Sequence, residues 1–96
     1  MKDKRKAYEE KIDAQLMEWN TEIALLNAKA DKAKAEAKVE YYKTIETLQG
    51  MQDKARMKLQ EIRTTGDDVW EDLKTGAENV WTEVNSAFQS AATKFK

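Results

Sequence analysis

The sequence contains no cysteine and no histidine among its 96 residues. Their absence excludes a disulfide framework, a thiol nucleophile, an imidazole base and the usual Cys/His zinc sites. Proline is also absent, although average usage would supply about five residues in a chain of this length. Nothing in the sequence therefore forbids very long helices.

Neither sign of charge is in large excess, because 17 lysine and arginine residues face 18 aspartate and glutamate residues. A nucleic-acid-binding protein usually carries a basic excess, so we expect no nucleic-acid partner. No apolar run reaches the roughly 18 residues that cross a membrane, and the charged stretch Met1–Lys11 does not resemble a signal peptide. We therefore expect a cytoplasmic protein without a transmembrane segment.

Helix-forming residues dominate what is present. Alanine, glutamate, lysine, leucine and arginine supply 47 of the 96 residues, a composition typical of a long helix or a coiled coil. The segment Ala28–Lys38 consists almost entirely of strong helix formers, so we expect no interruption there. We predict one long helix over about residues 3–64.

The first half of the chain carries an apolar seam with alternating spacings of four and three residues, which is the heptad pattern of a coiled coil. The seam consists of Ile12, Leu16, Trp19, Ile23, Leu26, Ala30, Ala33 and Ala37.

The second half contains an internal repeat of eleven residues, in which Val69–Leu73 is echoed by Val80–Val84. Eleven residues make about three helical turns, so equivalent apolar residues return to one side of the helix. The resulting apolar face spans roughly 140° of the helix surface. We predict a second, amphipathic helix over about residues 68–95.

Several turn signals coincide between the two predicted helices. Gly66 can end a helix in the left-handed conformation, and Asp68 with Glu71 matches an N-terminal capping box. We predict a turn at residues 65–67 within one helical domain over residues 1–96, with parts 1–64 and 68–96. The apolar stripe passes through Gly66 in phase, so one unbroken helix is the alternative.

The unequal lengths of the two helices point to self-association. An antiparallel hairpin would leave the seam from Ile12 to Ala30 uncovered within one chain. We therefore predict an all-α helical hairpin or coiled coil that forms a homo-oligomer, most simply an antiparallel dimer with a four-helix core. The predicted interface residues are Ile12, Leu16, Trp19, Ile23, Leu26, Leu48, Leu59, Ile62, Trp70, Leu73, Trp81, Val84, Phe88 and Phe95.

The apolar face of the second helix also fits a protein that adsorbs to lipid, to a hydrophobic granule or to unfolded protein. A helix that lies on a membrane normally carries lysine and arginine on its polar face. The charged residues here are mainly acidic, which disfavours anionic lipid but imposes no penalty on a neutral apolar surface. Adsorption is therefore the alternative to self-association.

Paired carboxylates such as Asp67 and Asp68 are the main candidates for chemistry. A general acid needs burial to raise its pKa, and a calcium loop needs more ligands than Gly66, Asp67 and Asp68 supply. We interpret these carboxylates as groups that stabilise a helix N-terminus. We expect no catalytic, cofactor-binding or metal-binding residue, no cofactor and no enzyme activity.

Several strings resemble small bacterial coiled-coil proteins of a stress-response family. They are Lys4–Lys11, Glu18–Asn20, Ala28–Ala33, the pair Tyr41-Tyr42 and the closing Trp-containing repeats. The resemblance covers nearly the whole chain and implies a soluble cytoplasmic helical protein made under stress, with no agreed molecular activity and no catalytic residues. The eleven-residue period is also similar to that of apolipoproteins and desiccation-protective proteins, which would imply protection of surfaces. We therefore expect a non-enzymatic protective or scaffold protein that acts through its apolar helix faces.

Overall fold

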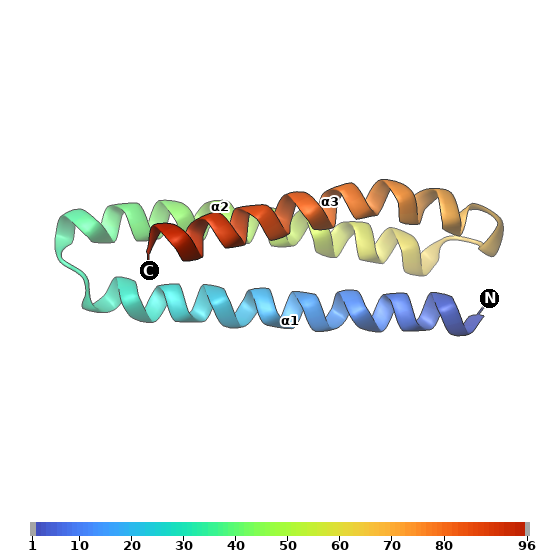
Figure 1. Ribbon diagram of the computed structural model, residues 1–96, viewed down its shortest axis with the longest axis horizontal. Coiled ribbons are helices and arrows are strands. Elements are labelled where there is room, and N and C mark those ends of the chain that lie inside the picture. Colours follow the sequence, from blue (N-terminus) through green and yellow to red (C-terminus); the bar gives the residue numbers. More distant parts are fainter. Residues whose placement is uncertain (1, 96) are drawn as a thin grey trace.

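The computed structural model describes residues 2–95, which fold into three helices, each antiparallel to the next (Figure 1). Helix α1 covers Lys2–Lys32, α2 covers Ala35–Thr64 and α3 covers Asp67–Lys94. The predicted all-α class is confirmed. The described helices run up, down and up, so the N-terminus lies beside the connection between α2 and α3 (Figure 1).

The prediction of one unbroken helix over about residues 3–64 is wrong, because the chain bends at Ala33 and Lys34 between α1 and α2. Local propensity favours a continuous helix there, but a continuous helix would leave the seam of α1 without cover in a single chain. Folding back at Ala33 lays that seam along α2 and α3. The free energy gained by burying apolar surface therefore outweighs the helix propensity of the residues at the bend.

The predicted break after Thr64 is confirmed, and the second helix begins at Asp67, one residue before the predicted start. Gly66 does not adopt the left-handed conformation, because its φ is −75° and its ψ is 161°. It occupies the N-cap position of α3 instead of Asp68. Asp67 and Asp68 both lie in the first turn of α3, where negative charge interacts favourably with the helix dipole.

The connection between α2 and α3 is held by Arg5 from the other end of the sequence. Its Nη2 donates to the carbonyl oxygens of Ile62 and Thr65, each at 2.6 Å. Its Nη1 donates to Oδ1 of Asp67 at 2.7 Å. Arg5 thus satisfies carbonyl groups that the end of a helix leaves without partners.

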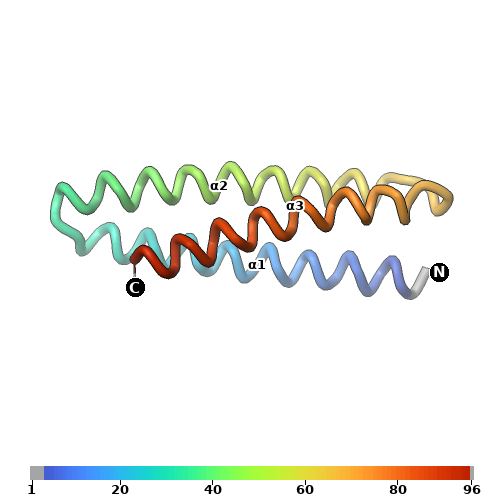
Figure 2. The backbone as a smooth tube through the Cα atoms, turned by 45° about the horizontal axis from the view of Figure 1, so that its top comes forward, coloured from blue at the N-terminus to red at the C-terminus, as the bar shows by residue number. Residues whose placement is uncertain are grey.

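The core runs along the whole length of the bundle, whose Cα atoms extend over 52 × 19 × 18 Å. All three helices run lengthwise along the bundle (Figure 2). Helices α1 and α3 each pack closely on α2, whereas the backbones of α1 and α3 meet at few points. The side between α1 and α3 is therefore closed mainly by side chains.

Gln52 is the buried polar residue of this core, with 4% of its surface exposed. Its Nε2 donates to Oδ1 of Asn20 at 2.6 Å and to the carbonyl oxygen of Leu16 at 3.3 Å. Both acceptors belong to α1, so this amide fixes how α2 lies along α1. A polar group at one core position can set the register of a helix pair in this way.

Candidate functional site: the cleft between α1 and α3

Large aromatic side chains bridge α1 and α3 where the two backbones stand apart. The rings of Trp19 and Phe88 are stacked, with centroids 5.5 Å apart and an interplanar angle of 11°. The ring of Tyr8 meets that of Trp70 edge to face, with centroids 5.8 Å apart. Aromatic pairs in these geometries contribute more than their buried area alone.

The two tryptophan indoles of these pairs are buried without a hydrogen-bond acceptor. Nε1 of Trp19 and Nε1 of Trp70 find no partner among residues 2–95. An unsatisfied buried donor costs about 1–3 kcal/mol, because the group gives up its hydrogen bond to water. The α1–α3 side therefore buries large aromatic rings while leaving two of their N–H groups without a hydrogen-bond acceptor.

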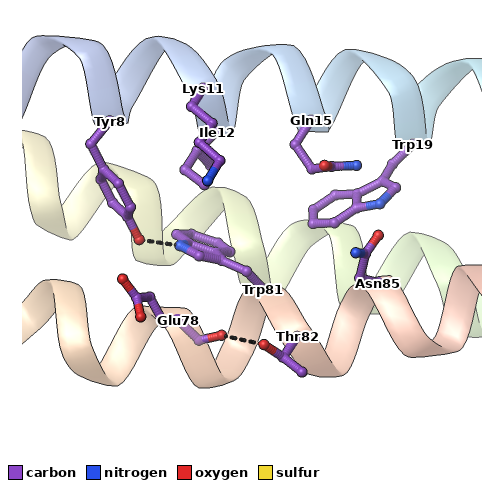
Figure 3. A pocket seen from close by; sticks show the side chains of 9 residues that line it. All are labelled: Tyr8, Lys11, Ile12, Gln15, Trp19, Glu78, Trp81, Thr82 and Asn85. Carbon is purple, nitrogen blue, oxygen red and sulfur yellow. Dashed lines mark hydrogen bonds between the residues drawn. The ribbon is translucent and has the colours of Figure 1, made fainter.

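A cleft of about 350 Å³ opens between the two helices beside these rings (Figure 3). Polar and charged groups share its walls with aromatic rings. The side chains that line it are Tyr8, Lys11, Ile12, Gln15 and Trp19 from α1, and Glu78, Trp81, Thr82 and Asn85 from α3.

Tyr8 and Trp81 join the two walls of the cleft, because Nε1 of Trp81 donates a hydrogen bond to Oη of Tyr8 (Figure 3). Burial raises the pKa of the Tyr8 phenol above its ordinary value of 10.0, the hydrogen bond from Trp81 opposes that rise, and the carboxylate of Glu78 adds to it. The phenol therefore stays neutral to higher pH than an exposed tyrosine does.

A second, smaller groove of about 120 Å³ lies on the same side, near the end of α3. Its apolar lining residues are Leu25, Leu26, Phe88, Ala92 and Phe95. The side chain of Lys29 extends from α1 across this groove, and its Nζ donates a hydrogen bond to the carbonyl oxygen of Phe95 at 3.3 Å. Both openings thus follow the line along which α1 and α3 face each other.

The groups that line the cleft determine what chemistry it could support. Its titratable lining groups are the Tyr8 phenol, the Lys11 amine and the Glu78 carboxylate. Within residues 2–95, no three or more carboxylates come together in a way that could hold a metal ion.

The structure places the predicted interface residues inside a single chain. Leu73, Trp81 and Phe95 are half-buried, and the remaining eleven are buried. The expectation that one chain leaves the N-terminal seam uncovered is therefore wrong. The bend after Lys32 supplies the missing cover, because it brings α2 and α3 onto the face that contains Trp19 and Ile23.

Two residues that shape this side were not among the predicted interface residues. Tyr8 lies four residues before Ile12, so the seam could have been extended to it by spacing alone. Arg5 gave no comparable signal, because its partners lie about sixty positions away. That pairing depends on how the three helices are arranged.

Comparison of the sequence with protein-family models, with curated proteins and with solved structures finds no match. Among residues 2–95, no helix is both long enough and apolar enough to cross a membrane.

Proposed function

We propose that this chain is a non-enzymatic cytoplasmic protein that self-associates through the apolar faces of its helices. The bundle keeps these faces inside one chain, so association requires the bundle to open. The observation that carries the proposal is the pair of buried indole N–H groups between α1 and α3, on Trp19 and Trp70, that lack an acceptor.

The α1–α3 side is where opening requires the least free energy. Separating α1 from α3 returns both indole N–H groups to water, which offsets part of the cost of exposing the rings. The same separation disrupts few close contacts between helix backbones, because α1 and α3 each pack mainly on α2. The closed bundle is therefore in equilibrium with an open form that presents Trp19 and its neighbours to another molecule.

The face that opening exposes is large enough to support association. It includes Trp19, Trp70 and Phe88, each at most 6% exposed in the closed bundle. Large aromatic side chains of this kind dominate the energetics of helical interfaces. A second copy offers the same face, so a symmetric assembly can bury it twice.

The likeness to small stress-response coiled-coil proteins supports a protective or scaffolding role. In such a role, conditions that loosen folded proteins would also open this bundle and raise its capacity to associate. Self-association would then increase under the conditions in which the protein acts.

Adsorption to lipid or to unfolded protein is the second candidate function. It is favoured by the single apolar face of α3, which buries Trp70, Ala77, Val80, Val84, Phe88 and Ala91. The neighbouring acidic residues make neutral surfaces the better target.

Sedimentation equilibrium from micromolar to submillimolar concentration, followed by flotation with neutral lipid vesicles, separates the two candidates. Self-association predicts that the mass rises from 11.1 kDa to twice that value and that the protein does not float. A chain that stays single and floats with the vesicles contradicts self-association and supports adsorption. A chain that stays single and does not float contradicts both.

A further inference from the structure

The connection between α1 and α2 lacks the features that usually specify a turn. It consists of Ala33 and Lys34, no glycine or proline stands nearby, and Asp31 is the one turn-favouring residue close to it. Lys34 has an ordinary extended conformation, with φ −71° and ψ 157°, and its side chain makes no capping hydrogen bond to α2. Apart from Asp31, whose Oδ1 accepts a hydrogen bond from Oη of Tyr42 at 3.5 Å, local residues do little to specify the bend, so it is maintained mainly by the packing of the helices.

The same segment is well suited to a continuous helix. Alanine and lysine are among the best helix formers, and the seam continues in phase through Leu26, Ala30, Ala33 and Ala37. In the closed bundle Ala33 is half-buried and Ala37 is exposed, so the seam is not fully covered at the bend. A straight helix would let these small side chains face another helix at close range.

The connection between α2 and α3 has a similar backbone, because Gly66 at the N-cap of α3 is also extended and makes no side-chain capping hydrogen bond. It differs in being held from outside, since the guanidinium of Arg5 donates to the carbonyl oxygens of Ile62 and Thr65. These contacts specify a turn at this joint. Of the two connections, the one between α1 and α2 is therefore the hinge.

We infer that the partner in self-association is a second copy of this chain, joined by exchange of α1. In the dimer, residues 2–64 form one helix, and α1 of each copy packs on α2 and α3 of the other. This inference rests on the proposed self-association and specifies its geometry. A short hinge between helices is a common site of such domain swapping.

The exchanged dimer preserves the contacts that hold the closed bundle together. Trp19 would stack on Phe88, and Gln52 would bind Asn20, between copies instead of within one chain. Two antiparallel long helices would cross near the former bend, where Ala33 and Ala37 permit close approach. Because α1 must leave its own bundle first, exchange should be slow compared with diffusion.

Two spin labels on one chain can distinguish the closed from the exchanged form. Glu18 and Asp53 are exposed, and they lie nearly opposite each other because Gln52 bonds both Leu16 and Asn20. The chain has no cysteine, so Glu18→Cys and Asp53→Cys give unique labelling sites. The two labels are separated by less than about 25 Å on neighbouring packed helices. On one continuous helix they are separated by about 53 Å.

Doubly labelled chains are mixed with an excess of unlabelled chains at submillimolar concentration, unfolded together and refolded. Electron paramagnetic resonance then reports only distances within one chain. Exchange predicts a population near 53 Å that grows with protein concentration. A dimer seen by sedimentation that shows only the short distance overturns exchange while leaving self-association standing. The absence of any dimer overturns both.

A proline at the hinge provides an independent test. Ala35 is the first residue of α2, where proline is well tolerated, and the extended Lys34 before it suits proline as well. Ala35→Pro should leave the closed bundle folded but reduce the exchanged population at least tenfold. Asp67→Pro, at the same position of α3, is the matched control. It removes the Arg5 ion pair from the closed and the exchanged form alike, so it should leave the ratio of closed to exchanged chains unchanged. Equal effects of both prolines, or no effect of Ala35→Pro, would overturn the assignment of the hinge.

Discussion

Trp19 on the first helix stacks on Phe88 of the third, with the two ring planes only 11° apart. This contact joins residues from opposite ends of the sequence and closes the side on which α1 and α3 stand apart. Trp19 is 1% exposed and Phe88 is 3% exposed, so the pair lies fully inside the bundle. It shows that one copy of the chain can cover its own seam.

Trp19→Ala should destabilise the bundle by about 3–5 kcal/mol, because it leaves a cavity against Phe88 that the helices can fill only partly. Urea denaturation followed by circular dichroism measures the change. Met17→Ala is the control, since Met17 is 69% exposed and should alter stability by less than about 0.5 kcal/mol. Similar losses for the two variants would show that Trp19 is not part of a packed core.

Arg5→Lys should cost about 1–2 kcal/mol, because a lysine cannot donate from one planar fork to Asp67 and to two carbonyl groups at once. Arg56→Lys is the matched control. Arg56 pairs with Asp53 on the surface, where 54% and 67% of the two side chains are exposed, so its replacement should have almost no effect. Thermal denaturation of both variants makes the comparison. If Arg5→Lys proved as neutral as the control, Arg5 would not hold the α2–α3 connection.

Stability should fall at alkaline pH because of Tyr8. Burial raises the pKa of this phenol above 10.0 in the folded chain, so the folded state favours the neutral form. The associated stability is fully present below pH 10.0 and is lost as the pH rises through the folded pKa. Tyr8→Phe should reduce this loss, whereas Tyr42→Phe, at an exposed position, should leave it in place.

Denaturation at a series of pH values measures this linkage, and absorbance of the tyrosinate form reports the titration directly. The tyrosinate signal with a pKa raised above 10.0 should disappear in Tyr8→Phe and remain in Tyr42→Phe. An alkaline stability profile that Tyr8→Phe leaves unchanged would contradict the role given to the buried phenol.

Gln52→Leu should change stability by less than about 1 kcal/mol, because an apolar residue of similar size replaces a buried amide whose acceptors stay satisfied by helix or water. The cost should appear as lost precision in the α1–α2 register. Spin labels at Glu18→Cys and Asp53→Cys should then give a broader short-distance distribution. Gln52→Ala, which also leaves a cavity, should destabilise more. An unchanged distribution in Gln52→Leu would mean that apolar packing alone sets the register.

The residues of the core could be predicted from the sequence because apolar spacing reports burial whatever the covering helix is. The periodicity places Trp19, Val84 and Phe88 on an apolar face, and each is buried. Periodicity says nothing about whether the cover comes from the same chain. The expected uncovered seam was wrong for that reason.

The bend at Ala33 could not be predicted because its residues prefer helix. The bend is explained only by the free energy gained when the apolar seam of α1 is buried. That gain depends on contacts between residues that are far apart in the sequence. The cleft between α1 and α3 has the same origin, since Tyr8 and Trp81 are brought together by the fold. Local signals were sufficient at Gly66, where a turn was predicted and found, although its backbone is extended and not left-handed.

The central claim is that the bundle must open between α1 and α3 before copies associate, and a covalent staple tests it most directly. Lys11→Cys and Thr82→Cys place thiols on opposite walls of the cleft, where a flexible bifunctional maleimide can join them. The same variant with each thiol capped separately is the control. In sedimentation equilibrium, the capped protein should form dimers while the stapled protein stays a single chain. A stapled chain that dimerises as fully as the capped one, or a capped chain that never dimerises, would contradict the account.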